Sequence, residues 1–529
     1  MNNIFIALAF ALYATILLLI GANGKKKIKT KSDFILGGRS FGALTSAFSA
    51  EAADMSAWLF MGLPGSILLY GIGKCWIAVG LLIGTILNWC IVAKRLRGAS
   101  EKYGNAETLP SYFANRFGDT NPILKRAILL STSIIIVVFF TVYLSSGLVA
   151  GGLLISSIFD VNYYIAVPII AIFIMSYTIL GGFIAISNAN VLQGSLMLFA
   201  VVFLPIITLL FLPGQAIQLP DGTMNGLQDG FATAIANFPQ HFLNPLYSIP
   251  SVSSSATDAI VSEHISLVSI ISDLSWGLGY FGMPHIIVRY MAIKDESEVK
   301  KSAIIAISWV TISLIAISFV GIIGRAVFGT NVPGSAENVF IQLLKINFID
   351  GRFNIPFIAG IFLCALVAAI MSTAAAQLIM SSSVIADNLI GSDDQKNSRN
   401  NKSKVKSNDK SKAEILINRV VIIIVTIIAL LISLKPDNSI MGLVSNAWAG
   451  FGAAFGPLVL YSLYSTKTNP VSAIAGIITG GLTVIIYDYL PLNTFGYSGT
   501  LYELTGLYSL VPGFFLSAFV IFVTSRKTN

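Results

Sequence analysis

The chain has 529 residues, of which 55% are hydrophobic and 11% are charged, and its mean hydropathy is +0.80. These values exclude an ordinary soluble domain and indicate a polytopic membrane protein whose surroundings are the lipid bilayer. The three cysteines and three histidines show no ligand spacing, which argues against a transition-metal site and a metal enzyme. The net charge of +8 gathers in short loops, so we predict neither a nucleic-acid partner nor an obligate protein partner.

Apolar stretches long enough to cross a bilayer recur along the whole chain. We predict an all-α fold with about 13 membrane-spanning helices, since about 20 apolar residues cross the hydrocarbon core. In chain order they cover residues 3–22, 42–70, 74–93, 127–154, 163–184, 190–212, 262–291, 302–326, 354–389, 415–434, 438–463, 470–489 and 506–524. No basic region precedes the first stretch, so we interpret it as a retained helix rather than a signal peptide.

Basic clusters fall on one side of the predicted membrane. They occupy residues 25–27, 94–97, 125–126, 294–301, 391–412 and 526–527. The positive-inside rule makes these loops cytoplasmic, which places the N-terminus outside and the C-terminus inside. The long loop 213–261 contains no Lys or Arg and falls outside by the same count. The polar segment 391–412 predicts a flexible cytoplasmic linker, with lipid binding as its alternative.

Two of the predicted spans carry polar or helix-breaking residues in their middle. The span 42–70 contains Glu51, Asp54 and the sequence Gly62-Leu-Pro-Gly65, and the span 262–291 contains three glycines and a proline between Trp276 and His285. Interrupted backbone at membrane depth is tolerated where it lines a cavity or is buried in protein, and a pair of such spans points to a transporter site. Helix packing is the alternative for any single glycine.

The interrupted spans are the second and the seventh in the chain. Five spans separate their starts, and an odd number reverses orientation, as two inverted five-helix repeats require. We therefore divide the chain into a first helix with its cytoplasmic loop, a first repeat, an extracytoplasmic loop, a second repeat and two C-terminal helices. Their bounds are 1–41, 42–212, 213–261, 262–463 and 464–529.

Polar side chains within the spans indicate where an ion would bind. An aspartate at the centre of a membrane helix costs roughly 2.5–3.5 kcal/mol, so we expect Asp54 to face a cavity, an ion or a partner. Glu51, one turn away, is expected nearer the cytoplasmic entrance. Ser372 and Thr373 lie among small residues in the ninth span, and hydroxyl and carbonyl oxygens suit a dehydrated monovalent cation. Hydrogen bonding to their own helix is the alternative.

Aromatic residues with polar tips lie near both interruptions, and they indicate a substrate pocket. They are Trp58, Tyr143, Trp276 and Tyr280. An interfacial belt or helix packing is the alternative for such residues.

Five motifs in chain order are similar to those of the sodium:solute symporter family. They are Ser32-Asp-Phe-Ile-Leu-Gly-Gly-Arg-Ser, Asp54-Met-Ser-Ala-Trp-Leu-Phe-Met-Gly-Leu-Pro-Gly, Trp276-Gly-Leu-Gly-Tyr-Phe-Gly-Met-Pro-His, Met371-Ser-Thr and Ala447-Trp-Ala-Gly-Phe-Gly-Ala-Ala-Phe-Gly-Pro. Each motif is weak alone, but five in this order and topology are specific. The resemblance implies a LeuT-like 5+5 inverted-repeat core in a bacterial plasma (inner) membrane. It also implies inward symport of L-proline with Na+ by alternating access, without a covalent step or a catalytic residue.

The same resemblance implies the residues of the two binding sites. Its sodium site would use backbone carbonyls of Ala52, Met55 and Ala369 and the hydroxyls of Ser372 and Thr373, with Asp54 supporting sodium affinity. Its solute would contact Ser56, Ala57, Trp58, Tyr143, Trp276 and Tyr280.

Three departures from the family pattern bear on substrate and stoichiometry. Ala57 stands where the resemblance implies glycine and Met283 where it implies glutamine, which keeps another small zwitterion or a monocarboxylate as an alternative solute. Asn190 replaces an aspartate of members that bind a further sodium, and Ala375 and Ala376 replace hydroxyl residues. We therefore expect one Na+ per solute and expect Asn190 to hydrogen-bond a neighbouring helix. A membrane sensor is the alternative of another class, but it would need an attached signalling domain.

Overall fold

The computed structural model describes residues 2–25, 31–118, 121–215, 218–219, 222–224, 226–249, 262–350, 353–390, 404–435, 439–491 and 499–526. Within them, helices predominate and the sheet content is one antiparallel pair of strands, β1 (Tyr247–Ser248) and β2 (Glu263–His264). The long helices are α1 (Asn2–Lys25), α5 (Cys75–Leu87), α8 (Pro122–Phe159), α9 (Tyr163–Phe211), α14 (Glu296–Phe328), α16 (Pro356–Ile390), α18 (Lys404–Ser433), α19 (Ile440–Tyr464), α20 (Pro470–Tyr489) and α22 (Leu510–Arg526).

Shorter elements join or interrupt these helices. They are α2 (Lys31–Ile35), η1 (Gly37–Arg39), α3 (Ala43–Asp54), η2 (Trp58–Gly62), α4 (Leu63–Tyr70), η3 (Ile72–Lys74), η4 (Asn88–Ala93), α6 (Lys94–Lys102), α7 (Leu109–Phe117), α10 (Phe231–Ala236), α11 (Leu267–Leu274), α12 (Trp276–Gly279), α13 (Pro284–Met291), η5 (Ala336–Asn338), α15 (Val339–Leu344), η6 (Lys345–Ile349) and α21 (Leu501–Thr505). Several begin where the sequence supplies a cap. At the start of α8, for example, the Asn121 side chain accepts hydrogen bonds from the amides of Ile123 and Leu124.

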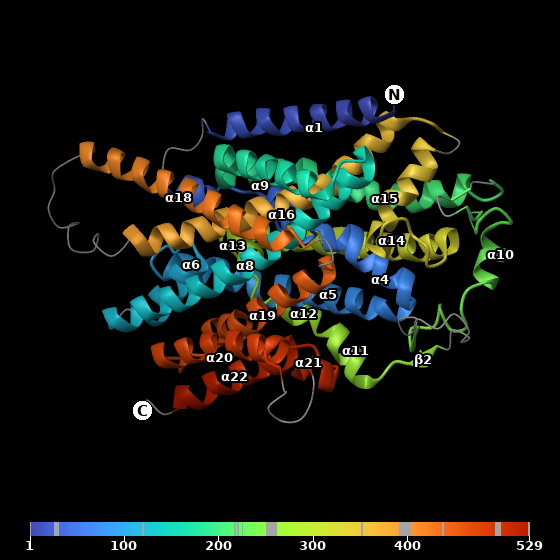
Figure 1. Cartoon of the computed structure of the whole chain (residues 1–529). Coiled ribbons are helices and arrows are strands. Elements are labelled where there is room, and N and C mark those ends of the chain that lie inside the picture. The colour runs from blue at the N-terminus through green and yellow to red at the C-terminus, as the bar shows by residue number, and fades with distance from the viewer. Residues whose placement is uncertain are drawn as a thin grey trace.

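The long helices lie side by side, with different segments at the two ends of the bundle (Figure 1). The C-terminus, α6 and the start of α18 lie at one end, whereas α10 and β2 lie at the other. The basic segments that the structure describes therefore lie opposite the described part of the long loop. This separation agrees with the sidedness that the charges predict, although the orientation in a membrane stays a prediction.

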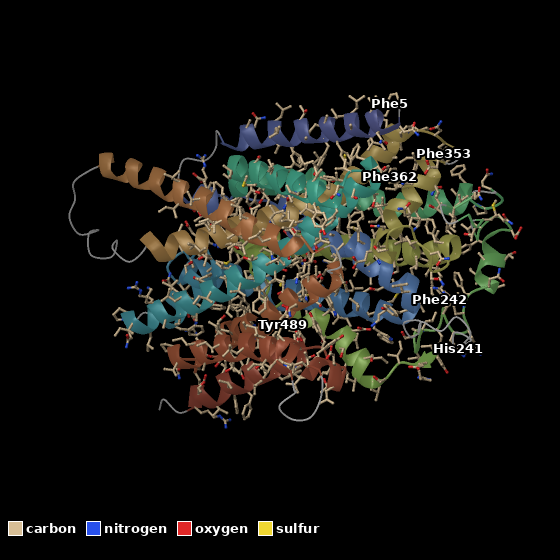
Figure 2. All side chains as sticks on the ribbon, in the orientation of Figure 1. Phe5, His241, Phe242, Phe353, Phe362 and Tyr489 are labelled. Carbon is tan, nitrogen blue, oxygen red and sulfur yellow. The ribbon has the colours of Figure 1, made fainter. Side chains whose placement is uncertain are left out.

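Apolar side chains cover the outside of the bundle. Phe5 on α1 is 43% exposed, Ile134 on α8 is 60% exposed and Phe515 on α22 is 61% exposed, and Figure 2 shows Phe5 at the outer edge. By contrast, 83% of the most apolar 18-residue window of α16 is buried, against 28% in α1. The corresponding window of α19 is buried to the same extent, so α16 and α19 form the centre of the bundle. An apolar outer surface is what a bilayer requires.

The helix lengths agree with a polytopic fold. Among the described residues, nine helices are long and apolar enough to cross a membrane, or ten when the bent pair formed by Ala43–Asp54 and Trp58–Tyr70 counts as one span. Two shorter apolar helices, Tyr163–Ile179 and Leu510–Arg526, and the three pieces between Leu267 and Met291 correspond to the remaining predicted spans. The number 13 therefore stays a prediction.

Two predicted boundaries were wrong. The fifth and sixth spans meet at Gly182 rather than at residues 185–189: the apolar helices Tyr163–Ile179 and Gly182–Phe211 join at a kink within α9, where Gly182 has a φ of 56° that glycine adopts readily. The predicted linker 391–412 is already helical from Lys404, where α18 begins. Lys, Ala and Glu favour helix and extend the apolar span toward its N-terminus. Residues 391–403 lie outside the described part of the chain.

Candidate ion and substrate site

The second span is broken where the sequence predicted it. The helix α3 and the stretch Trp58–Tyr70 are bent by 58° relative to one another. Met55 leaves the helical conformation with a ψ of 78°, and the amide of Ser56 donates to the carbonyl of Asp54 at 2.8 Å. Pro64 lacks an amide hydrogen, which favours the wide π-helical turn of η2 before α4. Carbonyl groups at the end of α3 are thereby released from helical hydrogen bonding.

The seventh span is broken into three short helices, α11, α12 and α13. Met283 is extended, with φ of −74° and ψ of 105°, as expected for a residue before proline. Gly277 lies against α5 so closely that a Cβ on it would be 2.3 Å from the carbonyl oxygen of Gly80. The packing alternative therefore accounts for this glycine, while the interruption itself is confirmed.

The central helix α16 brings two buried hydroxyl groups to the released carbonyls of α3. The Ser372 hydroxyl donates to the carbonyl of Ala52 and lies 3.2 Å from the carbonyl oxygen of Ala369. The Thr373 hydroxyl donates to the carbonyl of Ala53 at 2.8 Å. Hydrogen bonding to its own helix thus accounts for only part of the bonding of Ser372, and the hydroxyl of Thr373 bonds across to α3 instead.

This cluster can offer a cation several neutral oxygens. Each hydroxyl can rotate its proton away and turn a lone pair inward, as a hard cation requires. Three of the expected sodium ligands, Ala52, Ala369 and Ser372, meet directly, and Thr373 reaches the same end of α3. Met55, the other expected carbonyl, is the residue at which α3 unwinds. The carbonyl of Ala53 was not anticipated, because a hydroxyl's partner across two helices has no local sequence signal.

Asp54 connects the two broken segments. Its side chain is fully buried, and its Oδ2 accepts a hydrogen bond of 2.6 Å from the hydroxyl of Tyr280. Its other oxygen, Oδ1, has no hydrogen-bond partner among the described residues. The expected partner of Asp54 is therefore a residue of the other broken segment, since Tyr280 follows α12.

Glu51 is buried against a neighbouring helix. Its side chain is 3% exposed, and its Oε1 accepts from the indole nitrogen of Trp89 at 3.1 Å. Trp89 belongs to the π-helical turn η4, which joins α5 to α6. A tryptophan on a separate helix covers the carboxylate of Glu51, and its expected position nearer the cytoplasmic entrance stays a prediction.

The expected substrate residues form two hydrogen-bonded pairs and one aromatic stack. The hydroxyls of Tyr143 and Ser56 lie 3.2 Å apart, and Tyr280 binds Asp54 as described. Trp58 donates to the backbone carbonyl of Asp54 at 3.1 Å, and Ala57 beside it is fully buried.

Trp276 lies in the aromatic stack, away from these pairs. Its ring is stacked on Tyr508 with centroids 5.4 Å apart, and its carbonyl accepts from Trp448 at 2.7 Å. Ser56 and Tyr143 line a cavity of only 10 Å³, room for about one water molecule. A second, larger hollow of 470 Å³ is lined by Trp276 and Tyr508. A solute can therefore reach Ser56 only if the broken helices or the aromatic side chains move.

Two polar residues near this site, Arg289 and Tyr508, were not predicted from the sequence. Arg289 is 2% exposed, and its Nε donates to the Ser49 carbonyl at 2.7 Å. The side-chain amide of Asn190 donates to the same carbonyl at 3.3 Å, which confirms that it binds a neighbouring helix. Arg289 lies inside the predicted span 262–291, and a charge within a span was the signal that could have found it. Tyr508, at the start of the last span, offered no comparable signal.

A bundle of apolar helices in which two broken segments meet a central helix bearing hydroxyl groups is the architecture of an ion-coupled secondary transporter. The sequence profile of the Sodium:solute symporter family matches residues 34–480, and the chain belongs to this family. The family couples its solute to Na+, so Na+ is the coupling ion.

Named relatives and a solved structure agree with this assignment. The chain is 37% identical to the sodium/proline symporter of Escherichia coli (strain K12), over 98% of this chain and 92% of the relative. It is 36% identical to the high-affinity proline transporter PutP of Bacillus subtilis (strain 168), over 97% and 96% of the two chains. A substrate-bound, outward-open Na+-coupled sialic acid symporter superposes with a TM-score of 0.72 at 18% identity, covering 100% of this chain and 98% of that one. The expected all-α, LeuT-like fold is thus confirmed.

Proposed function

We propose that this chain imports L-proline together with Na+ by alternating access, with one Na+ per proline. The observation that carries the proposal is the meeting of the Ser372 and Thr373 hydroxyls with carbonyls released at the break of α3. The names of the similar proteins supply the solute, since relatives from two bacteria that cover nearly the whole chain are named proline transporters. One Na+ moving down a potential of 100 mV provides about 2.3 kcal/mol before its concentration gradient is counted.

In this proposal the sodium ion replaces the hydrogen bonds that now join α16 to α3. The ligands are the carbonyls of Ala52, Met55 and Ala369 and the hydroxyls of Ser372 and Thr373. Asp54 supports the ion through its charge, because its buried carboxylate lies at the same end of α3. Sodium would then hold the broken helix against the central helix.

The solute side uses the aromatic residues of both broken segments. We assign Ser56, Ala57, Trp58, Tyr143, Trp276 and Tyr280 to contacts with proline. The hydroxyl pair of Ser56 and Tyr143 is suited to a carboxylate, since either hydroxyl can turn its proton to an acceptor. Trp276 and Tyr508 would act as the outer cover, because their stacked rings line the larger hollow.

The proposed arrangement in the membrane follows the charges. The N-terminus is outside and the C-terminus is in the cytoplasm of a bacterial cell, and the two repeats cover residues 42–212 and 262–463. The grouping of basic segments at one end of the bundle supports this orientation. No enzymatic step is part of the mechanism, which consists of binding and conformational change.

Uptake of labelled proline tests the proposal. In a host that lacks its own proline transport, we expect the chain to confer uptake that requires Na+ and that stops when the sodium gradient is dissipated. Expression of the chain without sodium-dependent proline uptake would contradict the proposal. Competition by a panel of small zwitterions and monocarboxylates tests the second candidate, a different solute on the same fold. That candidate is favoured by Ala57 and Met283, both fully buried beside the broken backbone.

A further inference from the structure

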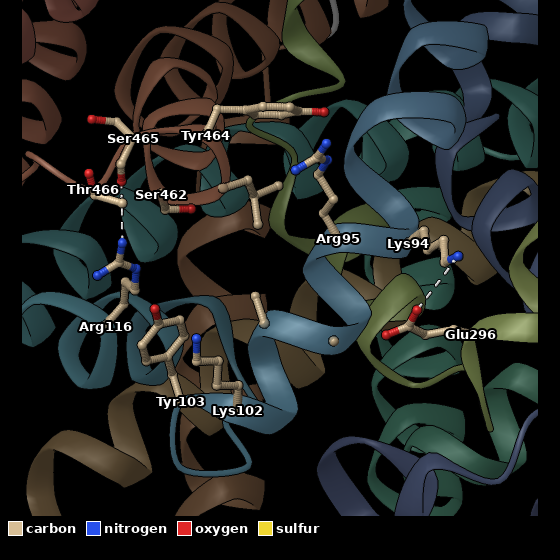
Figure 3. Close-up of a pocket in the computed structure, with 13 residues that line it drawn as sticks. Lys94, Arg95, Lys102, Tyr103, Arg116, Glu296, Ser462, Tyr464, Ser465 and Thr466 are labelled. Carbon is tan, nitrogen blue, oxygen red and sulfur yellow. Dashed lines mark hydrogen bonds and ion pairs between the residues drawn. The ribbon is translucent and has the colours of Figure 1, made fainter.

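A hollow of 610 Å³ lies at the end of the bundle where the basic segments gather, apart from the ion and substrate site. Four elements that are distant in sequence line it: α6, α7, the start of α14, and the end of α19 with the residues that follow. Its charged lining residues are Lys94, Arg95, Lys102, Arg116 and Glu296. Four cations therefore face one carboxylate around the same space (Figure 3).

Three of these cations have no carboxylate partner within the described part of the chain. Lys94 turns toward Glu296, 3.8 Å away, whereas Arg95 lies over the ring of Tyr464 at 4.3 Å. Arg116 lies 4.8 Å and Lys102 lies 5.6 Å from the centre of the Tyr103 ring. Aromatic faces hold these cations in place, yet they do not neutralise their charge. The positive charge therefore remains available to an anion.

Arg116 is the most firmly positioned of the group. Its Nη2 donates to the carbonyl of Ser465 at 3.3 Å, while its Nε is buried without a hydrogen-bond partner among the described residues. The helix that carries it, α7, begins with a reciprocal capping box between Thr108 and Ser111. Cations that only set membrane topology need to lie on one side, but they need no shared hollow or fixed donor.

We propose that this hollow binds a phosphate group, carried either by an anionic lipid headgroup or by a soluble phosphate compound. Arginine and lysine are the side chains that recognise phosphate oxygens, and the hydroxyls of Tyr103 and Thr466 add neutral donors. The hollow is larger than a phosphate needs, so it can hold the glycerol or sugar to which the phosphate is attached. This site is independent of the solute and ion proposed above.

A phosphate bound here would join two elements that lead to the transport site. The helix α6 continues α5, which packs closely on Gly277 of the second broken segment. The helix α19 carries Trp448, which donates to the carbonyl of Trp276 in the same segment. Binding would therefore fix the distance between the far ends of two helices that contact the moving part.

Thermal unfolding of the purified full-length chain in lipid nanodiscs tests the site. One arm titrates inorganic phosphate against chloride at equal ionic strength in phosphatidylcholine nanodiscs, and the other compares phosphatidylglycerol with phosphatidylcholine. We expect one of the two to raise the melting temperature. Stabilisation by phosphatidylglycerol alone identifies a lipid headgroup, and stabilisation by inorganic phosphate identifies a soluble compound.

Substitutions separate a built site from general surface charge. Lys102→Gln should raise the phosphate or phosphatidylglycerol concentration needed for half of the stabilisation at least fivefold, whereas Lys102→Arg should retain the wild-type response. Lys300→Gln removes an exposed cation outside the hollow and should change nothing. The proposal is overturned if neither anion stabilises the wild type, or if Lys102→Gln and Lys300→Gln respond alike.

Discussion

The two broken segments differ in how they are interrupted and in what they offer. The break at the end of α3 is short, and Asp54 before it and Ser56 after it are both buried. The segment from α11 to α13 breaks twice, at Ser275 and between Tyr280 and Met283, and it presents aromatic rings. The first segment thus offers backbone oxygens and charge, whereas the second offers rings and one phenol hydroxyl.

This difference matches the roles proposed above, in which the ion binds at the end of α3 and the second segment adds rings to the solute contacts of the first. Backbone carbonyls of α3 meet the hydroxyls of α16, a set suited to a small cation. The rings of Trp276 and Tyr280 pack with Trp448, a surface suited to an apolar ring such as that of proline. The hydrogen bond from Tyr280 to Asp54 links the two segments beside the ion site, so we expect ion and solute affinity to be coupled through it.

The largest expected effect comes from removing the negative charge of Asp54, which lies at the end of α3 beside the proposed sodium ligands. Asp54→Asn keeps an oxygen that can accept from Tyr280 but loses the negative charge. Hydrogen bonds to charged groups contribute about 1.5–3 kcal/mol, and we expect the sodium concentration for half-maximal uptake to rise roughly 10- to 100-fold. Sodium dependence of proline uptake at matched expression measures the shift. An unchanged sodium requirement would separate Asp54 from the ion site.

Two single-hydroxyl deletions, at Tyr280 beside Asp54 and at Tyr143 beside Ser56, test the ion contacts and the solute contacts separately. Tyr280→Phe leaves the Asp54 carboxylate without its donor, so we expect the sodium requirement to rise about tenfold. Tyr143→Phe removes a neutral contact with Ser56, and we expect the KM for proline to rise about two- to tenfold with little change in sodium dependence. The corresponding Ala variants control for ring packing. Equal shifts in both constants for both Phe variants would contradict the proposed separation of the ion contacts at Asp54 from the solute contacts at Ser56 and Tyr143.

The sequence alone predicts the parts of this molecule that local signals encode. Apolar length predicts the spans, and Gly62, Pro64 and Pro284 predict where two of them break. An intramembrane carboxylate predicts that Asp54 needs a partner, but it cannot say that the partner is Tyr280, because 226 residues separate the two. The stack of Tyr508 on Trp276 is likewise invisible, since the last span lies outside both repeats.

Two further features depend on backbone conformation that no single residue dictates. The kink at Gly182 lies a few residues before the predicted boundary of the fifth and sixth spans, and the π-helical turns η2 and η4 place Trp58 and Trp89 near Asp54 and Glu51. A π-helical turn costs hydrogen-bond geometry and persists because surrounding packing holds it. Such features follow from tertiary contacts rather than from local pattern.

A smaller effect is expected when one neutral oxygen is removed from the ion side. Thr373→Ala deletes the hydroxyl that binds Ala53 and leaves the helix α16 intact, whereas Thr373→Ser keeps the oxygen. A neutral hydrogen bond contributes about 0.5–1.5 kcal/mol, so we expect roughly a two- to tenfold higher sodium requirement for the Ala variant alone. Uptake at varied sodium and saturating proline measures it. A Ser variant as impaired as the Ala variant would show that the methyl group, not the oxygen, matters.

The smallest effect is expected at Asn190, which offers an amide rather than a carboxylate. Its amide and the Nε of Arg289 both bind the carbonyl of Ser49, so this position joins helices and already faces a fixed cation. Adding a second sodium beside a buried guanidinium would cost several kcal/mol of desolvation and repulsion. We therefore expect the sodium-to-proline flux ratio in proteoliposomes, and the Hill coefficient for sodium, to be about one. Asn190→Ala should change neither value, although it removes a helix contact and lowers thermal stability by about 0.5–1.5 kcal/mol. A flux ratio near two in the wild type, falling in Asn190→Ala, would instead make Asn190 an ion ligand and would end the single-site assignment.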